Sequence, residues 1–181
     1  PSTRYPRKIG ETLKPGVNYL IANSTVNDRD TLSALQKLVG AVFSYELHGE
    51  DCIEIDLTSK DYRHQGLIRH HSNTEKNEIL KLISKLDRLQ SINLRWNKVY
   101  KLPEDFAELR ELKHLDLGSN YMGTAPTWIA NLNHLEYLNL GVNELTIIPE
   151  EFCKLTELQT LAIHKNSIRY LPESFSALQK L

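Results

Sequence analysis

The sequence predicts an α/β solenoid, in which stacked coils place short parallel strands on one concave face and turns or short helices on the convex face. Leucines recur every 23 residues from Leu89 to Leu181. Within each unit two leucines alternate with polar residues, which is the pattern of a strand with one buried face. One asparagine and, in every unit, one proline also return at fixed positions. We therefore expect a right-handed arc with a concave parallel sheet.

Four complete units follow one another, and Leu181 would open the next. They read LQSINLRWNKVYKLPEDFAELRE, LKHLDLGSNYMGTAPTWIANLNH, LEYLNLGVNELTIIPEEFCKLTE and LQTLAIHKNSIRYLPESFSALQK. All share LxxLxLxxNxΦxxΦPxxΦxxLxx, where Φ is apolar. This pattern resembles the leucine-rich repeat family, specifically its LP-containing 23-residue class. The resemblance covers about residues 47–181 and implies a non-enzymatic role in protein recognition.

Each part of the unit has a physical reason. In the second unit Leu115 and Leu117 are expected to face the core, while His114 and Asp116 face away from it. The amide after each strand can donate to and accept from backbone groups where the chain turns. The proline lacks an N–H and keeps the residue before it extended. The asparagines predicted to form a ladder are Asn97, Asn120, Asn143 and Asn166, and the prolines are Pro103, Pro126, Pro149 and Pro172.

The second unit departs from this pattern on its return side. It has Gly123, and Ala125 where other units have leucine or isoleucine before proline. It also carries Trp128. We expect a locally altered convex turn with Trp128 packed over it.

The sequence before the repeats predicts a flanking region of residues 1–46, ahead of the repeats at 47–181. Residues 1–30 mix basic residues with proline and glycine and are expected to be extended or irregular. From Asp30, the expected N-cap, apolar residues recur at helical spacing to about Tyr45. A solenoid needs its first coil covered. This helix is the predicted N-terminal cap.

A further coil precedes the four regular ones. Residues 52–62 overlay residues 89–99, with Ile55 and Leu57 in place of Ile92 and Leu94. Leu57 and Leu94 are 37 positions apart, so this coil has 14 additional residues, which we place within 63–77. A helix over 75–88 should follow. The prediction is therefore five coils, the first with an insertion, in a solenoid that continues beyond Leu181.

Composition excludes several classes of function. The 181 residues carry a net charge of −1, which gives no reason to expect nucleic acid or an anionic membrane as partner. No apolar run can span a bilayer, and residues 1–10 lack a signal-peptide core. No nucleotide, zinc-protease or serine-hydrolase motif occurs, so no cofactor is expected. Many extracellular leucine-rich repeat proteins carry flanking cysteine clusters; this chain has only Cys52 and Cys153, which favours a cytoplasmic location or a bacterial source.

One cluster of residues raises a metal-binding alternative. Asp61, His64, His70 and His71 lie in or near the insertion, with Asp56 on the adjoining strand. Three of them would have to meet within about 2.2 Å of one point to hold zinc. The favoured interpretation is a solvated polar loop without metal, because no helical spacing aligns these side chains.

The candidate binding residues are the side chains that the repeat leaves on the concave face. Trp96 is the leading one, because tryptophan is a common interface anchor; it could instead lie against the insertion. Gly118 and Gly141 should leave a shallow pocket beside Tyr137. The full set is Asp56, Asn93, Arg95, Trp96, His114, Asp116, Tyr137, Asn139, His164 and Lys165.

The predicted function is that of an interaction module that binds a partner protein through the concave face. The alternative is a sensor or substrate-recruiting domain of a larger signalling enzyme, such as a GTPase, kinase or ubiquitin ligase, whose catalytic part lies outside this sequence. The bare last coil also offers a surface for end-to-end self-association.

Overall fold

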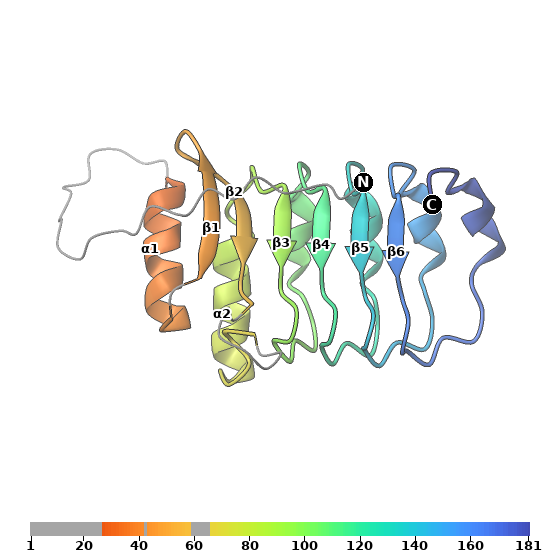
Figure 1. The fold of residues 1–181 in the computed structure, drawn as a ribbon, viewed down its shortest axis with the longest axis horizontal. Helices are drawn as coiled ribbons and strands as arrows, with labels where there is room; N and C mark the ends of the chain where they lie inside the picture. The colour runs from red at the N-terminus through yellow and green to blue at the C-terminus, as the bar shows by residue number, and fades with distance from the viewer. Residues whose placement is uncertain (1–26, 42, 59–65) are drawn as a thin grey trace, which may run out of the picture.

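The computed structural model describes residues 27–41, 43–58 and 66–181. It has a single row of strands backed by helices and turns (Figure 1). The chain begins with α1 (Asp28–Val39), β1 (Ser44–His48), β2 (Asp51–Asp56) and α2 (Asn73–Ile83). Four strand and 3-10 helix pairs follow: β3 (Ser91–Asn93) with η1 (Glu104–Glu108), β4 (His114–Asp116) with η2 (Thr127–Asn131), β5 (Tyr137–Asn139) with η3 (Glu150–Lys154), and β6 (Thr160–Ala162) with η4 (Glu173–Ala177).

The sheet confirms the predicted α/β solenoid. Its strands lie in sequence order from β1 to β6. Strands β2 to β6 are parallel, whereas β1 pairs antiparallel with β2. Ile55 lies opposite Ile92, and Ile92 opposite Leu115. The overlay of residues 52–62 on the regular repeats therefore holds over strand β2.

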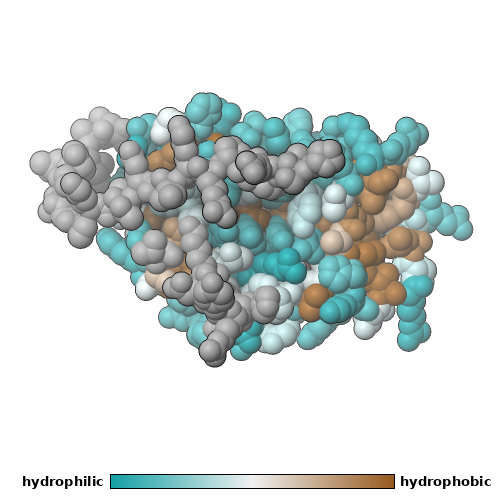
Figure 2. Space-filling model, in the orientation of Figure 1, coloured by the Kyte–Doolittle hydropathy of each residue, from teal (hydrophilic) through white to brown (hydrophobic). Residues whose placement is uncertain are grey.

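The core fills the space between the sheet and the return segments. Leu115 and Leu117 are fully buried, as are Phe106 and Phe152 of the return side. Trp128 is half-buried with its ring 6.3 Å from that of Phe106, so it packs over the convex side as predicted. In the last coil the corresponding Phe175 is only half-buried. Hydrophobic side chains accordingly gather at the C-terminal end of the surface (Figure 2).

The predicted asparagine ladder is present. Asn120 Oδ1 accepts hydrogen bonds from the backbone N–H groups of Asn97 (3.1 Å) and Val99 (3.0 Å) in the preceding coil. Its Nδ2 donates to the carbonyl oxygens of Leu94 (3.1 Å) and Leu117 (2.9 Å). Asn143 and Asn166 repeat this arrangement one and two coils further on. Each side chain thus links the turns of two adjacent coils.

Helix α1 is shorter than predicted. Its N-cap is Asn27, whose side chain accepts from Asp30 N–H at 2.9 Å, and not Asp30 itself. The helix ends at Val39, because Gly40 adopts a left-handed conformation (φ 68°) and donates to Gln36 O. Tyr45 therefore lies in strand β1, and the expected boundary at residue 46 falls inside that strand. The expectation for residues 1–26 lies outside the described residues.

The N-terminal end of the sheet is an antiparallel edge strand beside a helix. Leu32, Leu35 and Val39 of α1 join the common core, and α1 packs against α2. The edge strand is β1, which the sequence did not indicate. That this region caps the solenoid stays a prediction. No helix in the described part of the chain has the length and apolar content needed to cross a membrane.

The insertion rejoins the first coil at Ile68. The Ile68 N–H donates to Asn97 Oδ1 (2.9 Å), the same bond that Val99 makes with Asn120. Leu57 and Ile68 are 11 positions apart, whereas Leu94 and Val99 are five apart. Six of the 14 additional residues therefore lie between Leu57 and Ile68, partly before the predicted range of 63–77. The others follow Ile68.

Helix α2 begins earlier and ends sooner than the predicted 75–88. Ser72 is its N-cap and forms a capping box with Glu75. After Ile83 the chain continues in short turns closed by the N–H of Leu86 on Ile83 O (3.1 Å). Ile79, Ile83 and Leu86 are fully buried, as the helical spacing predicted.

Candidate protein-binding surface

The strand register brings the predicted side chains into rows across the sheet. One row is centred on His114 and Tyr137, which are direct neighbours on β4 and β5. Ser91 and Thr160 extend it on either side. A second row lies two residues further along each strand and consists of Asp56, Asn93, Asp116, Asn139 and Ala162.

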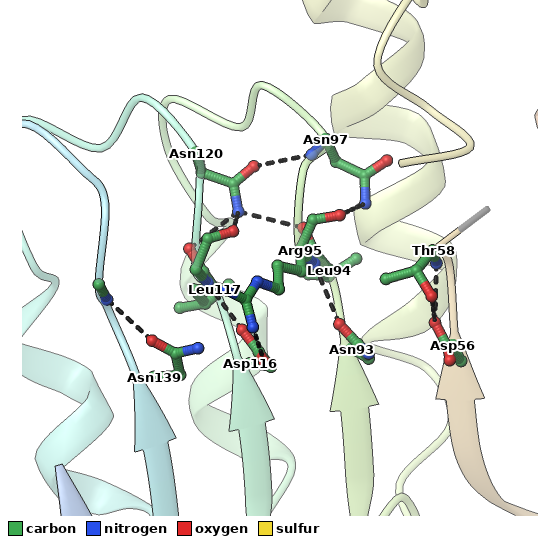
Figure 3. A network of polar contacts seen from close by, with 12 residues as sticks. Asp56, Thr58, Asn93, Leu94, Arg95, Asn97, Asp116, Leu117, Asn120 and Asn139 are labelled. Carbon is green, nitrogen blue, oxygen red and sulfur yellow. Dashed lines mark hydrogen bonds and ion pairs between the residues drawn. The ribbon is translucent and has the colours of Figure 1, made fainter. Parts of the chain in front are cut away.

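The second row holds the ends of the strands in place (Figure 3). In the first four coils one side-chain oxygen accepts from the backbone N–H two residues on: Asp56 from Thr58 (2.7 Å), Asn93 from Arg95 (3.1 Å), Asp116 from Gly118 (2.8 Å) and Asn139 from Gly141 (2.9 Å). These are Asx turns, a role typical of asparagine and aspartate. Four of the ten predicted binding residues therefore have a structural role.

Asn139 is the clearest case. It is 3% exposed, and its Nδ2 lies 2.8 Å from the position that a Cβ on Gly118 would occupy. A buried amide with a structural bond is not available to a partner, so we leave Asn139 out of the proposed surface. Asp116 stays accessible and its Oδ2 lies 3.9 Å from Arg95 Nη1.

Among the described residues, the two glycines leave no pocket beside Tyr137 of the kind expected. The space next to Gly118 is taken by Asn139, and the space next to Gly141 by the imidazole of His164. A side chain at either position would meet these groups as they now lie. The small residues make room for neighbouring polar side chains, and so they leave no hollow for a ligand.

A stacked pair of rings occupies the middle of the first row. The His114 and Tyr137 rings are 5.1 Å apart between centroids and inclined by only 15°. Both side chains are half-buried. The core lies on the other side of the strands, so this pair is not part of it. It presents a flat aromatic surface at the centre of the concave face.

Arg95 and Trp96 lie beside this pair, at the end of the neighbouring strand. The guanidinium carbon of Arg95 is 5.9 Å from the centre of the Trp96 ring, within the range of a cation–π contact. The Arg95 Nε is buried and has no hydrogen-bond partner within the described residues, and the same holds for Ser119 Oγ. Both atoms are enclosed by neighbouring groups, so we do not count them among the contacts offered to a partner.

Trp96 also supports the insertion. Its carbonyl oxygen accepts from Gly66 N–H at 3.0 Å, and its side chain is half-buried. Its φ is 66°, a left-handed value that is rare for a bulky residue. Ser119, Val142 and Lys165 have the same conformation at the same repeat position. The residue before each ladder asparagine is thus a fixed turn position, which sequence reasoning missed.

The N-terminal end of the face is acidic. Glu54 lies opposite Glu46 of β1 and two residues before Asp56. Burial, and then the charges of Glu46 and Asp56, raise the pKa of Glu54 above its usual 4.5. At the other end His164 and Lys165 are exposed. The face therefore changes from acidic to basic along the solenoid.

The metal-binding alternative finds no support in the described residues, among which no group of three or more metal-ligating side chains converges. His71 instead lies with Nε2 2.9 Å from the carbonyl oxygen of Leu38, which links the insertion to the end of α1. His70 is exposed. Asp61 and His64 lie outside the described residues.

Comparison with known proteins agrees with the repeat pattern. Residues 123–168 match the family model for the leucine rich repeat. A leucine-rich repeat protein of Leptospira interrogans, LIC12759, is 34% identical, with 56% of this chain and 26% of that chain covered and a TM-score of 0.54. The ectodomain of the Arabidopsis thaliana receptor kinase GASSHO1/SCHENGEN3, solved in complex with CASPARIAN STRIP INTEGRITY FACTOR 2, is 26% identical, with 55% and 12% covered and a TM-score of 0.52.

A plant ice-binding protein shares the fold at 20% identity, with 85% of this chain and 53% of that chain covered and a TM-score of 0.63. A search of curated proteins found no match. The chain spans about a quarter or less of the length of the Leptospira and Arabidopsis proteins. The units of this chain are leucine-rich repeats, which confirms the predicted family.

Proposed function

We propose that this leucine-rich repeat protein binds another protein through its concave face, and that it does so without catalysing a reaction. The contact would centre on His114, Tyr137, Arg95 and Trp96. His164 and Lys165 would form its basic edge, and the outer atoms of Asp56, Asn93 and Asp116 its polar rim. The fold is typical of interaction modules, and the Arabidopsis ectodomain was solved in complex with a named factor.

The observation that carries this proposal is the stacked His114–Tyr137 pair. Tyrosine, tryptophan and arginine are enriched among the residues that dominate binding energy at protein interfaces. Here an aromatic pair lies at the centre of a face that already has its core on the opposite side. The guanidinium of Arg95 is partly exposed and adds a charged group near the pair, 3.9 Å from Asp116 on the strand of His114.

The size of the face limits how a partner can bind. Five parallel strands spaced about 4.8 Å apart span only about 20 Å. A standard interface buries on the order of 800 Å² on each side. We therefore expect the partner to contact the flanking turns as well as the sheet.

Capture from a lysate of the source organism tests the proposal. Proteins retained by the wild-type chain and by Tyr137→Ala would be compared by quantitative mass spectrometry, with Tyr100→Ala as the control because Tyr100 is exposed and lies away from the sheet. We expect a partner retained by wild type and control and depleted at least tenfold by Tyr137→Ala, with thermal unfolding unchanged. Equal retention by all three chains would contradict the proposal.

A larger enzyme that uses this region to recruit a substrate is a second candidate. The match to a short part of a receptor kinase ectodomain favours it. In this second candidate, too, the concave face binds the other protein. The full reading frame distinguishes the two, since only the second candidate requires a catalytic domain in the same polypeptide.

A further inference from the structure

A second surface lies away from the concave face, where the return segments of three coils meet. It is a hollow of about 580 Å³ lined by the segments around Ala125, Ile148 and Pro172. Its volume lies within the range of roughly 300–1,000 Å³ common for ligand pockets. The hollow is shallow, however, because the Ile147 and Tyr170 side chains on its walls are 51% and 71% exposed.

The hollow includes one departure from the repeat. The position before proline is Leu102, Ile148 or Leu171 in the other regular coils but Ala125 here. Alanine lacks the branched carbons that these larger side chains contribute. Ala125 is 6% exposed and forms part of the lining. Most of the lining comes from the two coils that follow, so Ala125 lies at one end of the hollow.

Exposed apolar side chains border this depression. Ile147 occupies a repeat position that is Lys101 and Thr124 in the two preceding coils, and Tyr170 occupies it in the next. Large apolar groups in water cost free energy in proportion to their exposed area. The core of each coil is complete without Ile147 and Tyr170, so the fold does not require them to be apolar.

The rim of the hollow is acidic. Glu150 and Glu151 open η3, and Glu173 opens η4. All three line the hollow and are exposed, and within the described residues none forms an ion pair. Acidic residues suit the first turn of any helix. That preference explains each carboxylate singly, but not the exposed apolar groups beside them.

The lining also lacks positive charge. No lysine or arginine belongs to it, and Pro149 and Pro172 have no N–H. A ligand that is anionic would be repelled by the three carboxylates. A ligand with cationic donors and an apolar group can pair with the carboxylates of the rim and also pack against the apolar floor. A small molecule would stay largely in solvent in so shallow a site, whereas a peptide can extend across the three coils.

We propose that this hollow docks a short segment of another protein in which an aromatic or aliphatic residue lies next to arginine or lysine. The apolar side chain packs against Ile147 and Tyr170. The flanking cations lie against Glu150, Glu151 and Glu173. This surface is separate from the concave face, so it stands whether or not the concave-face proposal holds.

Synthetic peptides test this assignment. Three fluorescein-labelled nonapeptides on a Gly/Ser background would be compared by fluorescence anisotropy: one with a central Phe between two Arg, one with Phe between two Glu, and one with Gly between two Arg. We expect the Arg-Phe-Arg peptide to bind at least tenfold more tightly than the other two. Its affinity should fall as salt screens the carboxylates.

Two variants locate the site. Ala125→Leu restores the residue type of the other coils, so the chain should fold with a larger side chain in the lining. Glu150→Lys reverses one rim charge. We expect each variant to lower the affinity for the Arg-Phe-Arg peptide at least tenfold. Tyr137→Ala on the concave face should leave this affinity unchanged. In amide NMR spectra of the full chain, the peptide should shift signals within 124–127, 147–151 and 170–173.

The proposal is overturned if none of the peptides binds at millimolar concentration, if the Glu-flanked peptide binds equally well, or if Ala125→Leu binds as the wild type does. Sedimentation equilibrium gives a further check. A monomer–dimer equilibrium that Ala125→Leu abolishes would assign the hollow to a second copy of this chain and would also overturn the peptide assignment.

Discussion

At the scale of single residues, side-chain amides and carboxylates determine where each coil turns. Ladder asparagines bond across coils, and the second-row Asx residues bond within their own strand end. The first role was predictable, because an asparagine that returns every 23 residues is unlikely to serve a ligand. The second was missed because Asp and Asn alternate in that row. A recurring Asx two residues before the turn was the signal in the sequence.

Asn120 gives a direct test of the ladder. It is 3% exposed and makes hydrogen bonds on both sides of its amide. Alanine would leave buried backbone groups without partners, at about 1–3 kcal/mol for each unsatisfied group. We expect Asn120→Ala to lower the free energy of unfolding measured in urea by at least that amount. Asn133→Ala, at an exposed position, is the control and should change it by less than about 0.5 kcal/mol.

Glu54 predicts a pH dependence of stability. Because its pKa is raised in the folded chain, chiefly by burial, ionisation of Glu54 disfavours the fold. Its contribution to stability is thus fully present below its usual pKa of 4.5 and is lost as pH rises through the raised value. Glu54→Gln should remove this loss of stability. It should also remove the repulsion between Glu54 and Glu46 across the strand pair, which destabilises the fold by about 0.2–1 kcal/mol.

The measurement is the melting temperature of both chains from pH 3.5 to pH 7.5. We expect the two curves to separate as pH rises, with Glu54→Gln the more stable at pH 7.5. Glu144→Gln, an exposed residue with no ion pair in the described part of the chain, should follow the wild type. A constant difference between the Glu54→Gln and wild-type curves would show that burial of Glu54 does not couple to pH.

At the scale of elements, the regular coils follow from periodicity and the irregular ones do not. Strand registers and return prolines repeat, so their positions could be read directly. The end of α1 was misplaced because apolar residues continue at helical spacing past Gly40, whose left-handed backbone stops the helix. Strand β1 and the docking of Ile68 depend on contacts distant in sequence, which no local pattern encodes.

The left-handed backbone conformation of the residue before each ladder asparagine can be tested by substitution. Val142 has φ 58°, a conformation that is strained for a β-branched side chain and that asparagine tolerates. We expect Val142→Asn to raise the free energy of unfolding by about 1 kcal/mol. Thr156→Asn, at an exposed position that is not left-handed, is the matched control. A loss of stability in Val142→Asn alone would mean that contacts of the valine outweigh its strain.

At the scale of the whole molecule, the solenoid offers two surfaces with different chemistry. The concave face has an aromatic centre between an acidic and a basic end, and the hollow has an apolar floor with an acidic rim. The residues of the concave face could be predicted from the alternation of the strands. Their roles could not, since the Asx turns, the burial of Asn139 and the filled spaces beside the glycines arise only when coils stack.

Photo-crosslinking within the first row tests the central claim most directly. Benzoyl-phenylalanine would replace Thr160, an exposed neighbour of Tyr137 on β6, or Thr156 in the turn before that strand as a control. After irradiation with the captured partner, we expect a covalent adduct from position 160 that is lost when Tyr137→Ala is added, and little adduct from position 156. Equal adducts from both positions, or an adduct at 160 that persists with Tyr137→Ala, would contradict binding through the concave face.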